Sequence, residues 1–201
     1  KYPLIALGEV CTSLTAGGDV PQDNWTEQPS DINIIPIYSN GSGDKALYGY
    51  TNISRINKDS VTISARGTIG YTAVRKAPFY PAVRLIVATP DENKVKLKYL
   101  LEILTVLGFQ RAGKTIPQLT VPMVREKRIP VPSISVQEEI IAACDKLDEE
   151  YNAARTSIEI HKSDIESCFH ELDVADSHEQ HRFNLSDRSK FSVSIGQRVL
   201  T

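Results

Sequence analysis

A regular alternation of apolar and polar residues marks residues 135–172 as one long amphipathic helix. Small or apolar residues recur there at alternating steps of four and three, which is typical of a helix that packs against another helix. The positions of this seam are Ile140, Cys144, Leu147, Tyr151, Ala154, Ile158, His161, Ile165, Cys168 and Leu172. Ser135 and Glu138 fit a capping box and predict the start of the helix. At ~1.5 Å per residue it would span roughly 55 Å, so we interpret it as a spacer with a helix–helix interface.

Upstream of this helix, short alternating stretches predict strands. Strands are expected at residues 32–38, on both sides of the GTIG turn within residues 61–74, and at residues 79–89. In the last of these, Val83, Leu85 and Val87 would share one face. The first residues, 2–10, predict a short strand or turn.

Gly, Pro, Asp and Asn fill the connections between these strands. Residues 15–31 predict a long surface loop, with Trp25 packing it against the core. The period becomes helical between residues 95 and 109, and residues 111–122 are interpreted as a loop that leads into a strand. The pattern therefore predicts an α+β fold, in which a globular, mainly β domain with a short helix precedes one long coiled-coil helix.

Three segments follow from these boundaries. Residues 1–134 form the globular domain, residues 135–175 the spacer helix, and residues 176–201 a linker that is either a terminal tail or the start of a second domain. Pro132 cannot lie inside the helix and separates the first two segments. The sequence KFSVSIGQRV at residues 190–199 resembles KYPLIALGEV at residues 1–10, which favours an internal repeat and hence a second domain.

The charge of the chain changes sign along its length. The formal net charge is −2, but residues 1–135 hold 16 Lys and Arg against 11 Asp and Glu, residues 136–180 hold 3 against 13, and residues 181–201 hold 4 against 1. A polyanion such as DNA would be attracted to the flanking segments and repelled by the helix, because attraction follows local charge. A solvated coiled-coil surface that is merely acidic is the other interpretation of the helix.

Composition places the chain among cytoplasmic proteins rather than secreted or membrane proteins. No stretch approaches the ~18 uninterrupted apolar residues of a membrane span, and the start lacks a secretory signal pattern. Three widely spaced cysteines, Cys11, Cys144 and Cys168, predict a reducing compartment and no disulfide framework.

The sequence offers no motif for catalysis. It lacks the glycine-rich phosphate loops, the nucleophile elbow and the Asn-Pro-Pro-aromatic motif of an adenine methyltransferase. His170, His178 and His181 near Cys168 lack the spacing of a metal site. His161 within the seam either sets the register of helix pairing or lies exposed at its rim. We therefore predict a non-enzymatic chain without a metal or cofactor.

A family resemblance is carried by several stretches taken in order. Residues 113–141, GKTIPQLTVPMVREKRIPVPSISVQEEII, resemble the passage from a target recognition domain into the long helix of a type I restriction-modification specificity subunit. ARGTIG at residues 65–70, PFYPAVRLIV at residues 78–87 and the opening KYPLIALGEV are similar to the same family. The resemblance covers nearly the whole chain.

The resemblance implies a DNA target recognition domain that reads one half of a bipartite site in double-stranded DNA. It also implies methyltransferase subunits that bind S-adenosylmethionine, a restriction and translocase subunit, and a second recognition domain in cis or through a homodimer in trans. The alternative is the C-terminal recognition part of a fused adenine-N6 methyltransferase and restriction enzyme. A pure coiled-coil protein is disfavoured by the basic β domain.

Polar and basic residues on the loops between strands are the candidates for DNA contact, because phosphate contacts position a protein and base-edge contacts specify sequence. They are Ser39, Asn40, Ser42, Lys45 and Tyr48 in the first cluster, Arg66, Thr68, Tyr71, Arg75, Lys76 and Arg84 in the second, and Lys114, Thr115 and Gln118 in the third. The alternative for each is a solvated surface residue. Gly67 and Gly70 are interpreted as turn geometry.

Overall fold

The computed structural model describes residues 2–109 and 118–171. The chain divides into two compact units, Lys1–Asp148 and Glu149–Thr201. The α+β prediction, a mainly β domain followed by one long helix, is confirmed. Among the described residues, no helix combines the length and the apolar character that crossing a membrane requires.

Two four-stranded sheets and a two-stranded ribbon form the first unit. The first sheet has the order β2 (Cys11–Ala16), β9 (Ile86–Pro90), β6 (Ser60–Ile63) and β7 (Thr72–Arg75). The second has the order β3 (Trp25–Thr26), β5 (Leu47–Thr51), β4 (Ile35–Tyr38) and β8 (Tyr80–Pro81). The ribbon pairs β1 (Leu4–Ala6) with β10 (Arg128–Pro130). All pairings are antiparallel except that of β4 with β8.

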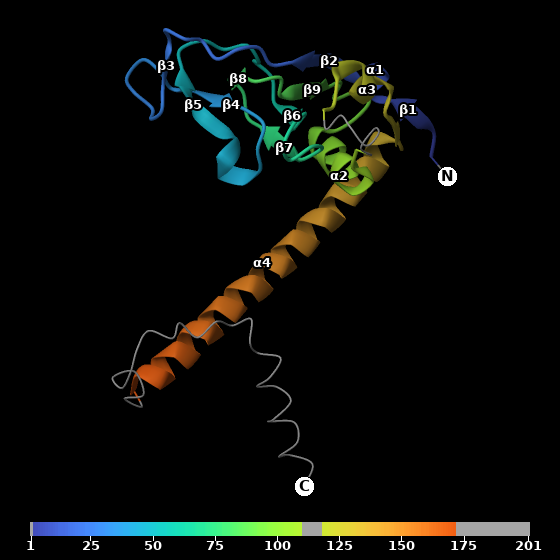
Figure 1. Cartoon of the computed structure of the whole chain (residues 1–201). Coiled ribbons are helices and arrows are strands. Elements are labelled where there is room, and N and C mark those ends of the chain that lie inside the picture. Colours follow the sequence, from blue (N-terminus) through green and yellow to red (C-terminus); the bar gives the residue numbers. More distant parts are fainter. Residues whose placement is uncertain (1, 110–117, 172–201) are drawn as a thin grey trace. The chain divides into compact units, whose positions relative to one another are not determined.

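The main core lies between the first sheet and the short helices. These are α1 (Leu7–Val10), α2 (Leu97–Leu107) and α3 (Val121–Glu126). Leu100 and Leu104 of α2 and Val61 and Ile63 of β6 are fully buried in it. Burial stabilises the fold by about 1.5–3 kcal/mol for each such side chain. Figure 1 shows these helices gathered around the first sheet, with β3, β4 and β5 at the other end of the unit.

The second sheet has a much smaller core. Ile37, Tyr80 and Ala82 form its buried apolar cluster, and Val20 and Trp25 pack against them. Trp25 also contacts Tyr48, with 5.0 Å between the ring centroids. The expected role of Trp25 in fixing the long loop is therefore confirmed, although the loop also contributes the short strand β3.

The strand predicted over residues 79–89 is wrong as a single element. It is divided into β8 and β9, which belong to different sheets. Val83 and Arg84 between them have φ of 50° and 63°, and their N–H groups donate to the carbonyls of Gly18 (2.8 Å) and Gly17 (3.1 Å). Val83 is therefore exposed, and it does not share a face with the buried Leu85 and Val87.

Two further expectations along the sheet edges need correction. The strand predicted at residues 32–38 begins only at Ile35, and Ile32 and Ile34 before it are exposed. The end of the predicted loop at 111–122 enters the helix α3, which the sequence analysis missed. Thr120 caps it by accepting from Met123 N–H (3.5 Å), and Pro122 lies in its first turn, where a missing N–H costs nothing.

The long helix, α4 (Ile134–Glu171), begins without the predicted capping box. Gln137 N–H donates to the Ser133 carbonyl (3.0 Å), so the helical hydrogen bonds start before Ser135. Glu138 pairs with Lys96 (3.6 Å) instead of turning back to Ser135. The buried Gln137 side chain fixes the helix start, because it accepts from Lys96 N–H and donates to the Lys94 and Pro132 carbonyls, each at 2.9 Å.

Candidate nucleic-acid interface

Three loops meet at one place in the first unit, and we name residues 39–46, 64–71 and 82–84 the three-loop face. Asn40 joins all three. Its Oδ1 accepts from Ala65 N–H (2.7 Å) and its Nδ2 donates to the Val83 carbonyl (2.6 Å). Because the two bonds reach across 25 and 43 residues of sequence, this one side chain fixes the loops relative to one another.

Further hydrogen bonds stiffen the first two loops. Gly41 N–H donates to Ser64 Oγ, and this hydroxyl donates to the Gly41 carbonyl, both at 3.2 Å. Tyr71 Oη accepts from Gly43 N–H (3.2 Å). The three-loop face is thus held in one arrangement before any ligand arrives, which lowers the entropy cost of binding.

The GTIG turn presents two of the predicted residues to solvent. Gly67 and Gly70 have φ of 66° and 80°, a region that favours glycine, so the turn geometry predicted for them is present. Gly70 N–H donates to the Ser64 carbonyl (2.9 Å) and closes the loop. Arg66 and Thr68 are exposed between these anchor points.

Arg66 brings the third predicted cluster to the same place. Its Nε and Nη2 donate to Gln118 Oε1 at 3.2 and 2.9 Å. Leu119 N–H donates to the Ala65 carbonyl (2.9 Å), which holds the backbone next to Gln118 beside the turn. Lys114 and Thr115 lie outside the described residues.

The predicted cations differ in what they contact. Lys45 and Arg84 are exposed, and neither forms an ion pair within residues 2–109 and 118–171. Lys76 pairs with Asp59 (2.7 Å), and its hydrogen bond lowers the pKa of that carboxyl, assisted by Ala77 N–H. Arg75 lies over the Tyr38 ring (4.1 Å), and its buried Nε has no hydrogen-bond partner in the described part of the chain.

The remaining members of the first cluster are mostly engaged in the fold. Ser39 N–H donates to the Ala46 carbonyl (2.8 Å), and Ser42 precedes the 3-10 turn Gly43–Ala46. Tyr48 is 44% exposed but packs on Trp25. The structure therefore joins Arg66 to Gln118 directly, and it joins Asn40 to Ala65, the neighbour of Arg66 in the sequence. Sequence reasoning missed Ser64, which no local pattern distinguishes from other strand residues.

The seam of α4 has two parts. Ile140 packs against the main core together with its neighbour Ile141, and Cys144 is half-buried. Farther along, Leu147, Tyr151, Ile158 and Ile165 are 45% to 67% exposed. Ala154 and Cys168 are exposed as well, and Leu172 lies outside the described residues.

His161 is exposed beside the apolar seam positions. Its Nδ1 lies 3.7 Å from a carboxylate oxygen of Asp164, one turn along the same helix. The exposed seam therefore leaves a stripe of large apolar side chains in contact with water along the described part of α4, which is unfavourable.

Comparison with known proteins agrees with this arrangement of domain and helix. Residues 2–162 match the family described as type I restriction modification DNA specificity domain. Two Mycoplasma pneumoniae proteins named as putative type I specificity subunits are 36% identical over 141 residues and 32% identical over 147 residues. The matches cover 70% and 73% of this chain but only 42% and 40% of those proteins, so the chain spans less than half of their length.

Solved structures show the same fold. A chain from a study of complex assembly and conformational transition of the type I R-M system has a TM-score of 0.69 at 19% identity, over 83% of this chain and 43% of that one. The HsdS subunit from Thermoanaerobacter tengcongensis has a TM-score of 0.61 at 20% identity, over 78% and 39%. With most of its length matched by the family, this chain belongs to the type I restriction-modification DNA specificity domains.

Proposed function

We propose that the first unit reads one half of a bipartite site in double-stranded DNA, as part of the specificity subunit of a type I restriction-modification complex. The observation that carries this proposal is the union of three loops through Asn40, with Arg66 and Gln118 presented beside it. A recognition surface must hold its polar groups in fixed positions, because a misplaced donor cannot distinguish one base edge from another.

Arg66 and Gln118 are the side chains that we assign to base reading. Arg donates to guanine O6 and N7, and Gln bonds to adenine N6 and N7, both in the major groove. In the free protein, two Arg66 nitrogens donate to the single Gln118 Oε1. The Gln118 Nε2 and the Arg66 Nη1 remain as donors for the DNA, and Gln118 would have to release Arg66 before its Oε1 could accept from adenine N6. Lys45 and Arg84, exposed on the same face, would contact phosphates and set the orientation.

Catalysis, in this proposal, belongs to other subunits. The chain would choose the sequence, methyltransferase subunits would modify adenine, and a restriction subunit would translocate and cut. The relatives described above are named as specificity subunits, which favours this function over the fused methyltransferase and restriction enzyme. No cofactor is assigned to this chain.

The helix has a separate part in the proposal. We assign residues 1–134 to recognition, residues 135–175 to the spacer and residues 176–201 to the beginning of a second recognition domain or a tail. The exposed seam of α4 would pair with a second helix, in cis or in a second copy. Two recognition domains held apart in this way would read a split site with an unread interval.

The direct test is selection from a randomised duplex library by the full-length protein together with its methyltransferase subunits. We expect enrichment of a split sequence. Replacement of Arg66 and Gln118 by Ala should relax the preference in one half-site, by about 1–3 kcal/mol for each base that is no longer read. Lys94→Gln, which removes an equal charge from an ion-paired lysine, is the control. A library without enrichment, or an unchanged preference in the double variant, would contradict the assignment.

A further inference from the structure

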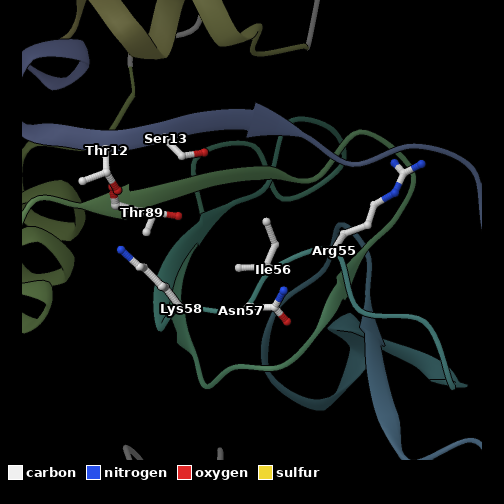
Figure 2. A pocket seen from close by; sticks show the side chains of 7 residues that line it. All are labelled: Thr12, Ser13, Arg55, Ile56, Asn57, Lys58 and Thr89. Carbon is white, nitrogen blue, oxygen red and sulfur yellow. The ribbon is translucent and has the colours of Figure 1, made fainter.

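An open hollow of about 270 Å³ lies at the edge of the first sheet, and none of the DNA-contact residues predicted from the sequence lines it. We name it the basic hollow. It is lined by Thr12, Ser13, Arg55, Ile56, Asn57, Lys58 and Thr89. Figure 2 shows Lys58 reaching toward Thr12 and Thr89, whereas Arg55 lies at the other end.

The lining is rich in hydrogen-bond donors and holds no carboxylate. Asn57 Oδ1 is occupied, since it accepts from the Ser54 hydroxyl (2.6 Å), and this leaves the amide Nδ2 as a donor. Ser13 adds a hydroxyl group, and Lys58 and Arg55 add two positive charges, whereas the Thr12 hydroxyl already donates to the Thr89 carbonyl (3.2 Å). Such a set of groups suits an anion.

The two cations are available to a ligand. In residues 2–109 and 118–171, neither Arg55 nor Lys58 forms an ion pair, in contrast to Lys76, Lys94 and Lys96. The carboxylate next to Lys58 in sequence, Asp59, is engaged by Lys76 Nζ and by Ala77 N–H. An anion in the basic hollow would therefore meet unneutralised positive charge.

The hollow is also fixed in shape. The N–H and carbonyl of Ile56 bond to the carbonyl and N–H of Phe79, both at 3.1 Å, and Arg55 N–H donates to the same Phe79 carbonyl (3.2 Å). The Arg55 guanidinium lies over the Tyr80 ring at 5.1 Å. On the opposite wall, an irregularity in the β2–β9 register between Cys11 and Ser13 accompanies the Thr12 bond to the Thr89 carbonyl.

Backbone contacts connect the hollow to the three-loop face. Gly18 lies against the Arg55 guanidinium, so close that an added Cβ would come within 2.8 Å of Nη1. The Gly18 carbonyl accepts from Val83 N–H, and the Gly17 carbonyl accepts from Arg84 N–H. Arg55 therefore borders the turn that carries Arg84, and the positive charge continues from the turn into the hollow.

We propose that the basic hollow binds a phosphodiester of the DNA backbone beside the half-site read by the three-loop face. This inference rests on the proposed function and adds a contact site to it. Side chains of Lys, Arg, Ser, Thr and Asn supply most phosphate contacts in protein–DNA complexes, and such contacts position the protein without reading sequence. The basic hollow would therefore raise the affinity for DNA and help to orient the protein on it, whichever base pairs are recognised.

The test uses the full-length protein with Lys58→Gln, and with Asn57→Ala as a second variant that removes no charge. Lys94→Gln is the matched control, because it also removes one charge but from a lysine paired with Asp91 at 3.5 Å. DNA affinity is measured across salt concentrations on duplexes selected by the unaltered protein. We expect Lys58→Gln to flatten the slope of log K against log salt by about 0.9 while base preference stays unchanged. The control should leave the slope as it is.

Different outcomes separate the two proposals. If Arg66→Ala changes base preference but Lys58→Gln and Asn57→Ala leave affinity and slope unchanged, the hollow is no DNA contact and the recognition function stands. If the unaltered protein binds no DNA, both proposals fail. A calorimetric titration with inorganic phosphate provides the last arm: saturation at sub-millimolar phosphate, abolished in Lys58→Gln, would assign the hollow to a free anion and overturn the DNA assignment.

Discussion

At the scale of single residues, Asn40 connects three segments that are far apart in the sequence. A carboxamide is suited to this role, since it offers an acceptor to Ala65 N–H and a donor to the Val83 carbonyl at the same time. Asn40 was predicted to contact DNA. In the structure it holds the three loops together, so it supports the proposed recognition surface.

Replacement of Asn40 by Ala should lower the free energy of unfolding by about 1–2 kcal/mol, because Ala65 N–H loses a bond in a partly buried place and the Val83 carbonyl loses one at the surface. Chemical denaturation measures this change. DNA base preference should weaken in the same variant, since the three loops lose their common anchor. Asn52→Ala at an exposed position is the control, with an expected change within about 0.5 kcal/mol. A stable Asn40→Ala variant would show that Ser64 and Gly41 suffice to fix the loops.

Asp59 provides a prediction on pH. The hydrogen bond from Lys76 lowers the pKa of Asp59 below its ordinary value of 3.8, so the ion pair stabilises the fold above that pH and its contribution is lost as pH falls through the folded pKa. The pair is exposed, so we expect less than about 1 kcal/mol. Denaturation midpoints of Asp59→Asn and the unaltered chain should differ at neutral pH and converge in acid. A constant difference across pH would contradict this.

At the scale of elements, the sequence pattern predicted those strands and helices that are determined by interactions between residues close together in the chain. The β6–β7 hairpin follows from alternation and two turn glycines, and α2 from apolar positions that recur on one face. The division of residues 79–89 depends on hydrogen bonds to Gly17 and Gly18, more than 60 residues away, and no local pattern records such partners. The start of α4 likewise depends on the buried Gln137, whose partners include Lys94 and Lys96.

The exposed seam of α4 predicts a specific pairing if its partner is a second copy running antiparallel. The positions are symmetric about residue 156, so Leu147 would lie opposite Ile165, Tyr151 opposite His161 and Cys144 opposite Cys168. Mild oxidation should then give a covalent dimer that either Cys144→Ser or Cys168→Ser abolishes. Burial raises the pKa of Cys11 to about 12, so this thiol should not react.

A parallel pair would leave a cross-link in each single cysteine variant, because each cysteine would face its own copy. As an independent check, Leu147→Asp with Ile158→Asp should weaken association on the order of 100-fold or more, since apolar burial is removed at both positions. Light scattering measures the change. A chain that is already monomeric at high concentration would exclude a second copy as the partner and leave a helix in cis.

At the scale of the whole chain, the family, the fold class and the presence of a domain followed by a long helix could be predicted from the sequence. The clusters around Asn40, Arg66 and Gln118 were predicted separately, and only the folded chain shows that they meet. The basic hollow could not be found in this way, because Thr12, Lys58 and Thr89 come together through pairing of strands that are distant in sequence. Charge counting along the chain predicted a basic domain but not which cations remain unpaired.

The unequal cores of the two sheets bear on how such a protein could change over evolutionary time. In the described part of the chain, the buried apolar cluster at the first sheet has sixteen residues, and the cluster at the second sheet has three. Mutations in the second sheet and its loops should therefore lower the free energy of unfolding less than mutations in the first sheet do. Drift in the second sheet, followed by selection, could therefore reshape the loop of residues 39–46 that joins β4 to β5, while Arg66 stays on the turn between β6 and β7 of the more stable first sheet.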